Sequence, residues 1–183
     1  MRIDFTGFTE DAILRGELLL EGDRLSDFVT QDGPFEIEHV TLEALDDGRV
    51  VRVPATMVAR SDLIAIAGAG PRGNAARRIR TRPYPARAEA GPYEIVGYVH
   101  APPSAHPLNG VLRRAVLPIT SAVIRYRIGD RPMEQSHDAL LTNPTYIKWL
   151  AAATDEDLRV GKTFELPGTA DAHSKDMTSE PVF

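Results

Sequence analysis

A glycine-rich loop is the first segment whose residues could bind a cofactor. Gly68, Gly70 and Gly73 follow a short apolar segment and match the pattern G-x-G-x-x-G. In dinucleotide-binding folds this loop opens a long helix, whose N-terminus holds the pyrophosphate, within a parallel βαβ unit. Here only a short run of residues follows before Pro83, which breaks a helix. We therefore interpret the motif as part of a linker and expect no cofactor.

An arginine cluster in the same region is the strongest local charge feature. Guanidinium groups bind phosphates, and an adjacent aromatic ring can stack on a base, so nucleic acid is one possible partner. An acidic protein surface or a lipid headgroup is another, and a solvated linker without a partner is a third. These alternatives stay open. The cluster comprises Arg72, Arg77, Arg78, Arg80, Arg82, Tyr84 and Arg87.

The histidines and serines do not form a recognisable catalytic or metal motif. The five histidines show neither H-x-x-x-H nor H-E-x-x-H spacing. Ser136, His137 and Asp138 are adjacent, but neighbours on a strand point to opposite faces and cannot form one relay. A G-x-S-x-G elbow and a P-loop are also missing from the sequence. We predict no catalytic residue and no metal ligand.

Composition sets the broad class of the protein. The chain has 183 residues, of which 43% are apolar and 26% charged, values typical of a folded protein. The net charge of −5 gives no general attraction to nucleic acid. Cysteine is absent, which excludes disulfides and thiolate chemistry. Because no apolar stretch has the length of a signal peptide or a membrane span, we expect a cytoplasmic protein.

The first half reads as strands around one short helix. A strand is expected within residues 12–21, and a helix over 24–31, where Leu25, Phe28 and Val29 share one face. The next strand, 35–45, changes its alternation near His39, which indicates a bulge. After a turn at 46–48, Pro54 places the strand 49–59 at a sheet edge. A short strand over 61–67, apolar from Leu63 onward, closes this half.

The second half repeats that order after a linker over residues 68–92. Strands are expected at 93–101, 117–128, 131–143 and 145–153, with a turn at Gly129. A helix over 108–116 is predicted from Leu108, Val111 and Leu112 on one face.

The two halves align at a nearly constant offset of 81–83 residues, which indicates an internal duplication. We predict a first repeat over 1–67, the linker 68–92, a second repeat over 93–165 and a flexible tail over 166–183. The aligned pairs are Gly16 with Gly97, Leu25 with Leu108, Phe28 with Val111, Val29 with Leu112, Phe35 with Leu117, Ile37 with Ile119, Arg49 with Arg131, Met57 with Leu140, Val58 with Leu141, Ile64 with Ile147 and Ile66 with Trp149.

Three segments resemble an uncharacterised family of small bacterial β-domains. They are the strand around Gly16, the run Arg24-Leu25-Ser26-Asp27-Phe28, and the closing segment Ser61–Ile66. The second half keeps Gly97, Leu108-Asn109 and residues 143–147 but not the R-L-S-D run. The order of elements is also similar to Sm-like barrels, although there a helix precedes the first strand. The resemblance implies a tandem small β fold and supplies no catalytic residue.

These observations predict a β-rich α+β fold: two tandem copies of a small curved antiparallel sheet or barrel, each with one short helix. The preferred function is a non-enzymatic assembly or adaptor protein that acts through protein–protein contacts, including self-association into an oligomer. The first alternative is nucleic-acid binding through the arginine-rich linker. The second is a small-ligand binder or enzyme with its site between the two copies.

Overall fold

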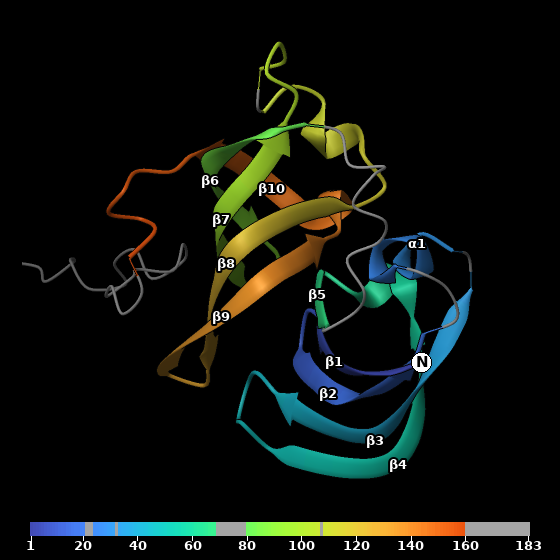
Figure 1. The fold of residues 1–183 in the computed structure, drawn as a ribbon. Helices are drawn as coiled ribbons and strands as arrows, with labels where there is room; N and C mark the ends of the chain where they lie inside the picture. Colours follow the sequence, from blue (N-terminus) through green and yellow to red (C-terminus); the bar gives the residue numbers. More distant parts are fainter. Residues whose placement is uncertain (21–23, 32, 69–79, 107, 160–183) are drawn as a thin grey trace, which may run out of the picture.

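The structure is a computed structural model. It describes residues 1–20, 24–31, 33–68, 80–106 and 108–159. Ten strands pair, all antiparallel, in the order β10-β6-β7-β8-β9-β5-β1-β2-β3-β4 (Figure 1). The strands are β1 (Arg2–Phe8), β2 (Ala12–Leu19), β3 (Pro34–Ala44), β4 (Val50–Ala59), β5 (Ala65–Gly68), β6 (Arg82–Ala90), β7 (Tyr93–Ala101), β8 (Leu117–Ile128), β9 (Arg131–Thr142) and β10 (Ile147–Ala152).

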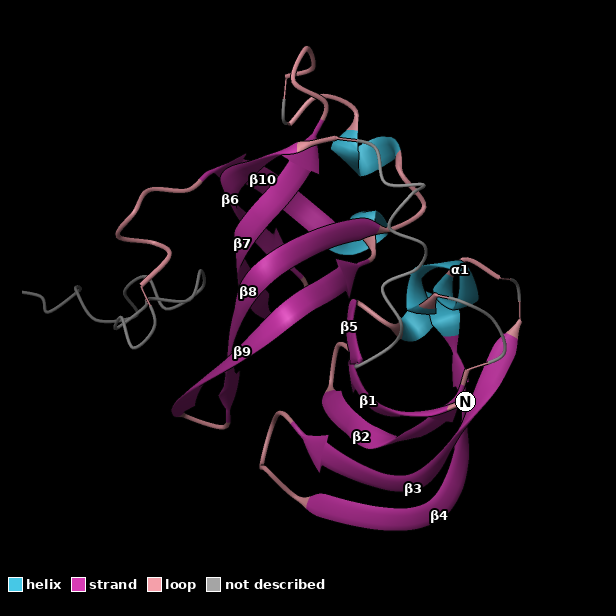
Figure 2. Cartoon of the chain, in the orientation of Figure 1, coloured by secondary structure: helices cyan, strands magenta, loops and turns pink. Residues whose placement is uncertain are grey.

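The predicted fold class, α+β with one helix in each of two sheets, is wrong. One sheet runs through both halves, because β5 of the first half pairs with β9 of the second. Helix is confined to one α-helical turn and three 3₁₀ turns in the described part of the chain (Figure 2). These are α1 (Leu25–Val29), η1 (Arg60–Asp62), η3 (Val111–Arg113) and η4 (Pro144–Tyr146).

Strand pairing within the sheet nevertheless repeats. The first half pairs in the order β5-β1-β2-β3-β4, and the second half in the order β10-β6-β7-β8-β9. Each half also places a 3₁₀ turn just before its last strand, η1 in the first and η4 in the second. The two halves therefore have the same connectivity, even though their pairing merges them into one sheet.

A matching irregularity in both halves bends the sheet. The β2·β3 ladder shifts register between Arg15 and Glu17, and the β7·β8 ladder does so between Val96 and Tyr98. Opposite these shifts, His39 and Ser121 adopt positive φ angles of 52° and 47°. The bulge that the sequence predicts near His39 is present, and the second half contains its counterpart.

Gly16 and Gly97 sit inside these two bulges. A Cβ atom added at Gly16 would lie 2.6 Å from the carbonyl oxygen of Glu38, and one added at Gly97 would lie 2.8 Å from that of Thr120. The close approach of the neighbouring strand explains why both positions lack a side chain.

The offset between the halves grows along the chain, which corrects part of the sequence alignment. His39 and Ser121 are 82 positions apart, so Phe35 corresponds to Leu117. Val58 lies opposite Phe35, and Thr142 lies opposite Leu117. Val58 therefore corresponds to Thr142 rather than to Leu141, and Met57 to Leu141 rather than to Leu140.

The alignment of the last strands also slips by one residue, because of a bulge in β10 of the second half. The β10·β6 ladder shifts between Ile147 and Trp149, leaving Lys148 out of the ladder. Ala65 pairs with Phe8, and Trp149 pairs with Glu89, the residue equivalent to Phe8. Trp149 therefore corresponds to Ala65, not to Ile66.

The helix predicted over 108–116 is wrong. Gly110 has φ +73° and ends any right-handed helix there, so only the 3₁₀ turn η3 follows. Val111 is buried, but Leu112 is 46% exposed and does not share its face. In the first half α1 agrees with the prediction, with Leu25 and Phe28 buried.

Part of the predicted linker is a strand. Residues 82–90 form β6, which pairs with β7 along its whole length. Ala86, Ala88 and Ala90 alternate into the core, but alanine carries little strand signal in a sequence. Both prolines, Pro83 and Pro85, lie before the stretch that pairs with β10. Residues 69–79 and the predicted tail, 166–183, lie outside the described residues.

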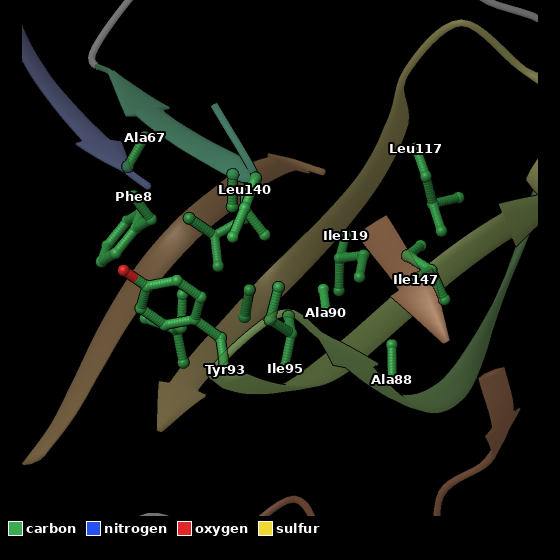
Figure 3. Packing of buried hydrophobic residues seen from close by; sticks show 14 of the residues in the cluster. Phe8, Ala67, Ala88, Ala90, Tyr93, Ile95, Leu117, Ile119, Leu140 and Ile147 are labelled. Carbon is green, nitrogen blue, oxygen red and sulfur yellow. The ribbon is translucent and has the colours of Figure 1, made fainter. Parts of the chain in front are cut away.

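Two hydrophobic clusters fill the sheet's concave faces. The smaller cluster belongs to the first half and includes Phe5, Phe35 and the α1 residue Phe28. The larger cluster belongs mainly to the second half but takes Phe8 and Ala67 from the first (Figure 3). No helix in the described ranges is long and apolar enough to cross a membrane.

Candidate functional site: a sheet junction and two free edges

The junction between the halves is a strand pair. Ala65 lies opposite Thr142, and Ile66 lies opposite Leu141. Just outside the ladder, the backbone N–H of Asn143 donates to the carbonyl oxygen of Ile64 at 2.8 Å. β5, an outer strand of the first half, thus pairs with β9, an outer strand of the second half. The two halves are therefore connected by backbone pairing, which side-chain packing reinforces.

Side chains from the first half complete the core of the second at this junction. The rings of Phe8 and Tyr93 meet edge to face with centroids 5.5 Å apart. The Tyr93 hydroxyl donates to the carbonyl oxygen of Thr9 at 2.6 Å. A Cβ added at Gly91 would lie 2.6 Å from Ile64, so this turn accepts Ile64 only because it is glycine. Figure 3 shows Phe8 beside Tyr93 and Leu140.

β4 and β10 are the two edge strands of the sheet as described, and each has a neighbour on one side only. β4 carries apolar side chains that face solvent: Val50, Val51 and Met57, the last 60% exposed. β10 carries Trp149, which is 37% exposed. Exposed apolar residues on unpaired edges are the feature that natural sheets usually avoid, so these edges are candidate contact surfaces.

A hollow of about 560 Å³ adjoins the β4 edge. Leu14, Leu42 and Val58 form its apolar floor, and three acidic residues, Glu10, Asp11 and Asp62, lie on its walls. The remaining lining residues are Thr9, Ala12, Thr56, Met57, Ala59 and Tyr146.

Trp149 is held on the outer face of β10 by charged neighbours. Its indole Nε1 donates to Glu89 at 2.8 Å, and the guanidinium of Arg87 lies 5.6 Å from the ring centroid. The other oxygen of Glu89 accepts from Lys148 at 2.9 Å. The hydrogen bond from Lys148, aided by that from Trp149, lowers the pKa of the Glu89 carboxyl despite its burial. Glu89 is therefore ionised at neutral pH and orients the indole.

A buried ionic network lies behind this edge. Arg125 donates to Glu94 at 2.9 Å and to Glu134 at 2.8 Å, with only 2% of its side chain exposed. Burial opposes its charge, but the hydrogen bonds that it donates to these carboxylates outweigh that cost and raise the pKa of Arg125. The same guanidinium donates to the carbonyl oxygens of Asp157 and Arg159. This network positions the segment after β10.

The structure divides the predicted arginine cluster. Arg72, Arg77 and Arg78 lie outside the described residues. Arg80 and Arg82 are exposed, and Tyr84 is half-buried against the larger core cluster. Arg87 forms ion pairs with Glu94 at 2.6 Å and Asp157 at 3.5 Å, so its charge is already matched within the chain.

The histidines are spread over different surfaces. His100 hydrogen-bonds to Thr120 at 2.8 Å, and His137 packs edge to face on Phe8. Burial lowers the pKa of His137. His39 lies within 4.8 Å of Glu17 and Glu38, but Arg2 already bridges these two carboxylates.

Sequence reasoning identified the strands that form the edges but not the hollow beside them. Pro54 correctly placed β4 at an edge, since the β3·β4 ladder passes over Pro54 without a pair. The alternation of apolar residues in β2 and β3 predicts the residues of the hollow's floor. It does not predict the hollow itself, which depends on the side chains that leave the space open.

Comparisons with protein-family models, with curated proteins and with solved structures found no match.

Proposed function

We propose that the protein is a non-enzymatic assembly protein whose contacts are made by the free edges of its sheet. The observation that carries the proposal is the β5·β9 junction. There the outer strand β5 of one half pairs with the outer strand β9 of the other, and the two halves have the same connectivity. The chain thus already contains, at β5·β9, the kind of strand pairing that we propose for its free edges β4 and β10.

The chemistry of the edges supports this role. Met57 on β4 and Trp149 on β10 expose apolar surface along strands that have one neighbouring strand each among the described residues. Adding a strand to such an edge provides backbone hydrogen bonds, and the alternate side chains provide specificity. The described ion pairs near β10, by contrast, are used internally to orient Trp149 and Arg125.

Size-exclusion chromatography with light scattering over a wide concentration range tests the proposal. We expect a mass above that of one chain, falling to the single-chain mass on dilution. Met57→Lys should lower the association constant at least about tenfold, because a lysine on an edge strand opposes pairing. Leu19→Lys is the matched control, since Leu19 is similarly exposed but lies on the interior strand β2. A single-chain mass at every concentration would contradict the proposal.

A further inference from the structure

We infer that the contact is head-to-tail between copies of this chain: β4 of one copy pairs with β10 of the next in the register of the internal junction. This inference rests on the proposed function and specifies its partner and geometry. The same interface would then occur within each chain and between chains, so association would continue from copy to copy. Such a contact produces a closed ring, or a filament where the rotation does not close.

The register follows from the equivalence of the strands. Ala65 and Ile66 of β5 correspond to Trp149 and Leu150 of β10, because both pairs occupy the same places against β1 and β6. Thr142 and Leu141 of β9 correspond to Val58 and Met57 of β4. The internal pairs Ala65·Thr142 and Ile66·Leu141 therefore become Trp149·Val58 and Leu150·Met57 between copies. In this register Trp149 shares one face of the joined sheet with Val58, and the exposed Met57 shares the other face with Leu150.

The hollow beside β4 is the unfilled counterpart of the internal junction. Its floor residues Leu14 and Leu42 correspond to Ile95 and Ile124 in the second half, by the matching β2·β3 and β7·β8 ladders. Ile95 and Ile124 are fully buried in the cluster that Phe8 and Ala65 complete. In the first half no described segment takes that place, and the hollow remains. The equivalent segment of a second copy, β10 with β6, would fill it.

The sizes of the side chains at the two contacts are complementary: where the incoming residue is small the receiving residue is large, and the reverse. At the internal junction the small Ala65 faces a receiving half that carries the large Tyr93. At the free edges the incoming residue is the large Trp149, and the position equivalent to Tyr93 is Ala12, which lines the hollow. The larger indole thus has room where the receiving half lacks a ring, as close packing of an interface requires.

Charge is also complementary at the proposed contact. The walls of the hollow carry Glu10, Asp11 and Asp62. Lys148 precedes Trp149 on β10, and 63% of its side chain is exposed. Lys148 is the bulge residue next to Trp149, so in the inferred register it lies near Ala59, which lines the hollow as Asp62 does. Lys148 also pairs with Glu89 in its own chain, so it brings a basic group, already held in place, to the acidic lining of the hollow; this favours one orientation.

Cysteine cross-linking tests the register, because the chain has no native cysteine. Met57→Cys protein is mixed with Leu150→Cys protein, and Thr56→Cys protein is mixed with Ala151→Cys protein, under mild oxidation. Adjacent opposite pairs alternate between close and wide spacing, so at least one mixture has suitable disulfide geometry. We expect a disulfide-linked dimer in one of the mixtures, and a ladder of multimers from the chain carrying both cysteines of that pair.

Arg52→Cys mixed with Leu150→Cys is the matched control, since Arg52 is exposed on β4 but far from the inferred register. We expect at most one-tenth of the cross-linking there. Multi-chain particles whose disulfides form mainly between two Met57→Cys chains, between two Leu150→Cys chains or equally in the control would overturn the head-to-tail inference. They would leave edge-mediated assembly intact. A protein that stays single-chain in light scattering would overturn both.

Discussion

The Tyr93 hydroxyl donates a 2.6 Å hydrogen bond to the carbonyl oxygen of Thr9, linking the core of the second half to the first half of the chain. The Tyr93 side chain is fully buried, whereas Thr9 is half-buried. Tyr93→Phe should reduce the free energy of unfolding by about 1–3 kcal/mol, because the Thr9 carbonyl loses its buried donor. Chemical denaturation measures this loss. Tyr146→Phe, which removes an exposed bond to Ser61, should cost less.

Tyr93 also predicts loss of stability at alkaline pH. Burial raises the pKa of its hydroxyl far above the ordinary value, because the folded state disfavours the phenolate. The folded form therefore binds the proton more tightly than the unfolded form. This contribution is complete below the unfolded pKa of about 10 and declines as pH rises above it. Denaturation midpoints should fall between pH 9 and about 11, and the fall should be smaller in Tyr93→Phe.

Part of the repeat was visible in the sequence because both halves need glycine at the same point. Gly16 and Gly97 stand where the neighbouring strand leaves no room for a Cβ, so the two glycines align in the sequence. The slip between Ile66 and Trp149 was not visible, because the extra residue at Lys148 is a β-bulge that depends on pairing with β6. A shift of one residue exchanges the faces of a strand, so it also hid the equivalence of Trp149 and Ala65.

The fold class and the contact surfaces depended on long-range pairing. The segment 108–116 has helical periodicity, but Gly110 adopts a left-handed conformation that interrupts it. Residues 82–90 contain two prolines and buried alanines, and only pairing with β7 makes them a strand. The merger of two sheets into one depends on the short β5 meeting β9, which no local pattern encodes. The hollow follows from that merger, since it is the position that a described segment fills in the second half but not in the first.

The two bulge glycines give a matched pair of predictions. Gly16→Ala and Gly97→Ala should each destabilise the protein by about 1–3 kcal/mol, since the new methyl group would overlap a backbone oxygen of the adjacent strand. Thermal or urea unfolding measures both. Gly110→Ala is a useful comparison, because its φ of +73° strains alanine but no atom lies within 4 Å. It should cost about 1 kcal/mol. Equal losses at all three positions would contradict the steric explanation.

Arg125 should be among the most sensitive positions in the chain. Replacing it with methionine leaves Glu94 buried and without one of its cationic partners, and removes donors from the carbonyl oxygens of Asp157 and Arg159. Loss of one member of a buried ion pair costs about 3–5 kcal/mol. Arg127→Met, on the same strand, removes only an exposed hydrogen bond to Asp130 and should change stability by less than about 0.5 kcal/mol. Urea titration of both variants makes the comparison.

Adding Glu94→Gln to Arg125→Met separates charge from shape. The double variant no longer carries the buried carboxylate that Arg125→Met leaves with Arg87 as its remaining described cationic partner. It should therefore recover part of the lost stability, whereas a purely steric role for Arg125 predicts no recovery.

Trp149 reports on the β10 edge because it is the single tryptophan. The hydrogen bond from Lys148 lowers the pKa of Glu89, with a smaller contribution from Trp149. The ionised carboxylate is therefore more stable in the folded state than in the unfolded state. That contribution is complete above the unfolded pKa of about 4.3 and is lost as pH falls through the lower folded value. Tryptophan emission should therefore be constant from pH 7 to about 5 and change below about 4. Glu89→Gln keeps an oxygen acceptor but has no titrating group, so its emission should not show this transition. A wild-type transition that persists unchanged in Glu89→Gln would mean that another group holds the indole.

The same emission also follows association, since pairing of β10 with β4 would cover the indole and shift its emission maximum to shorter wavelength as the protein concentration rises.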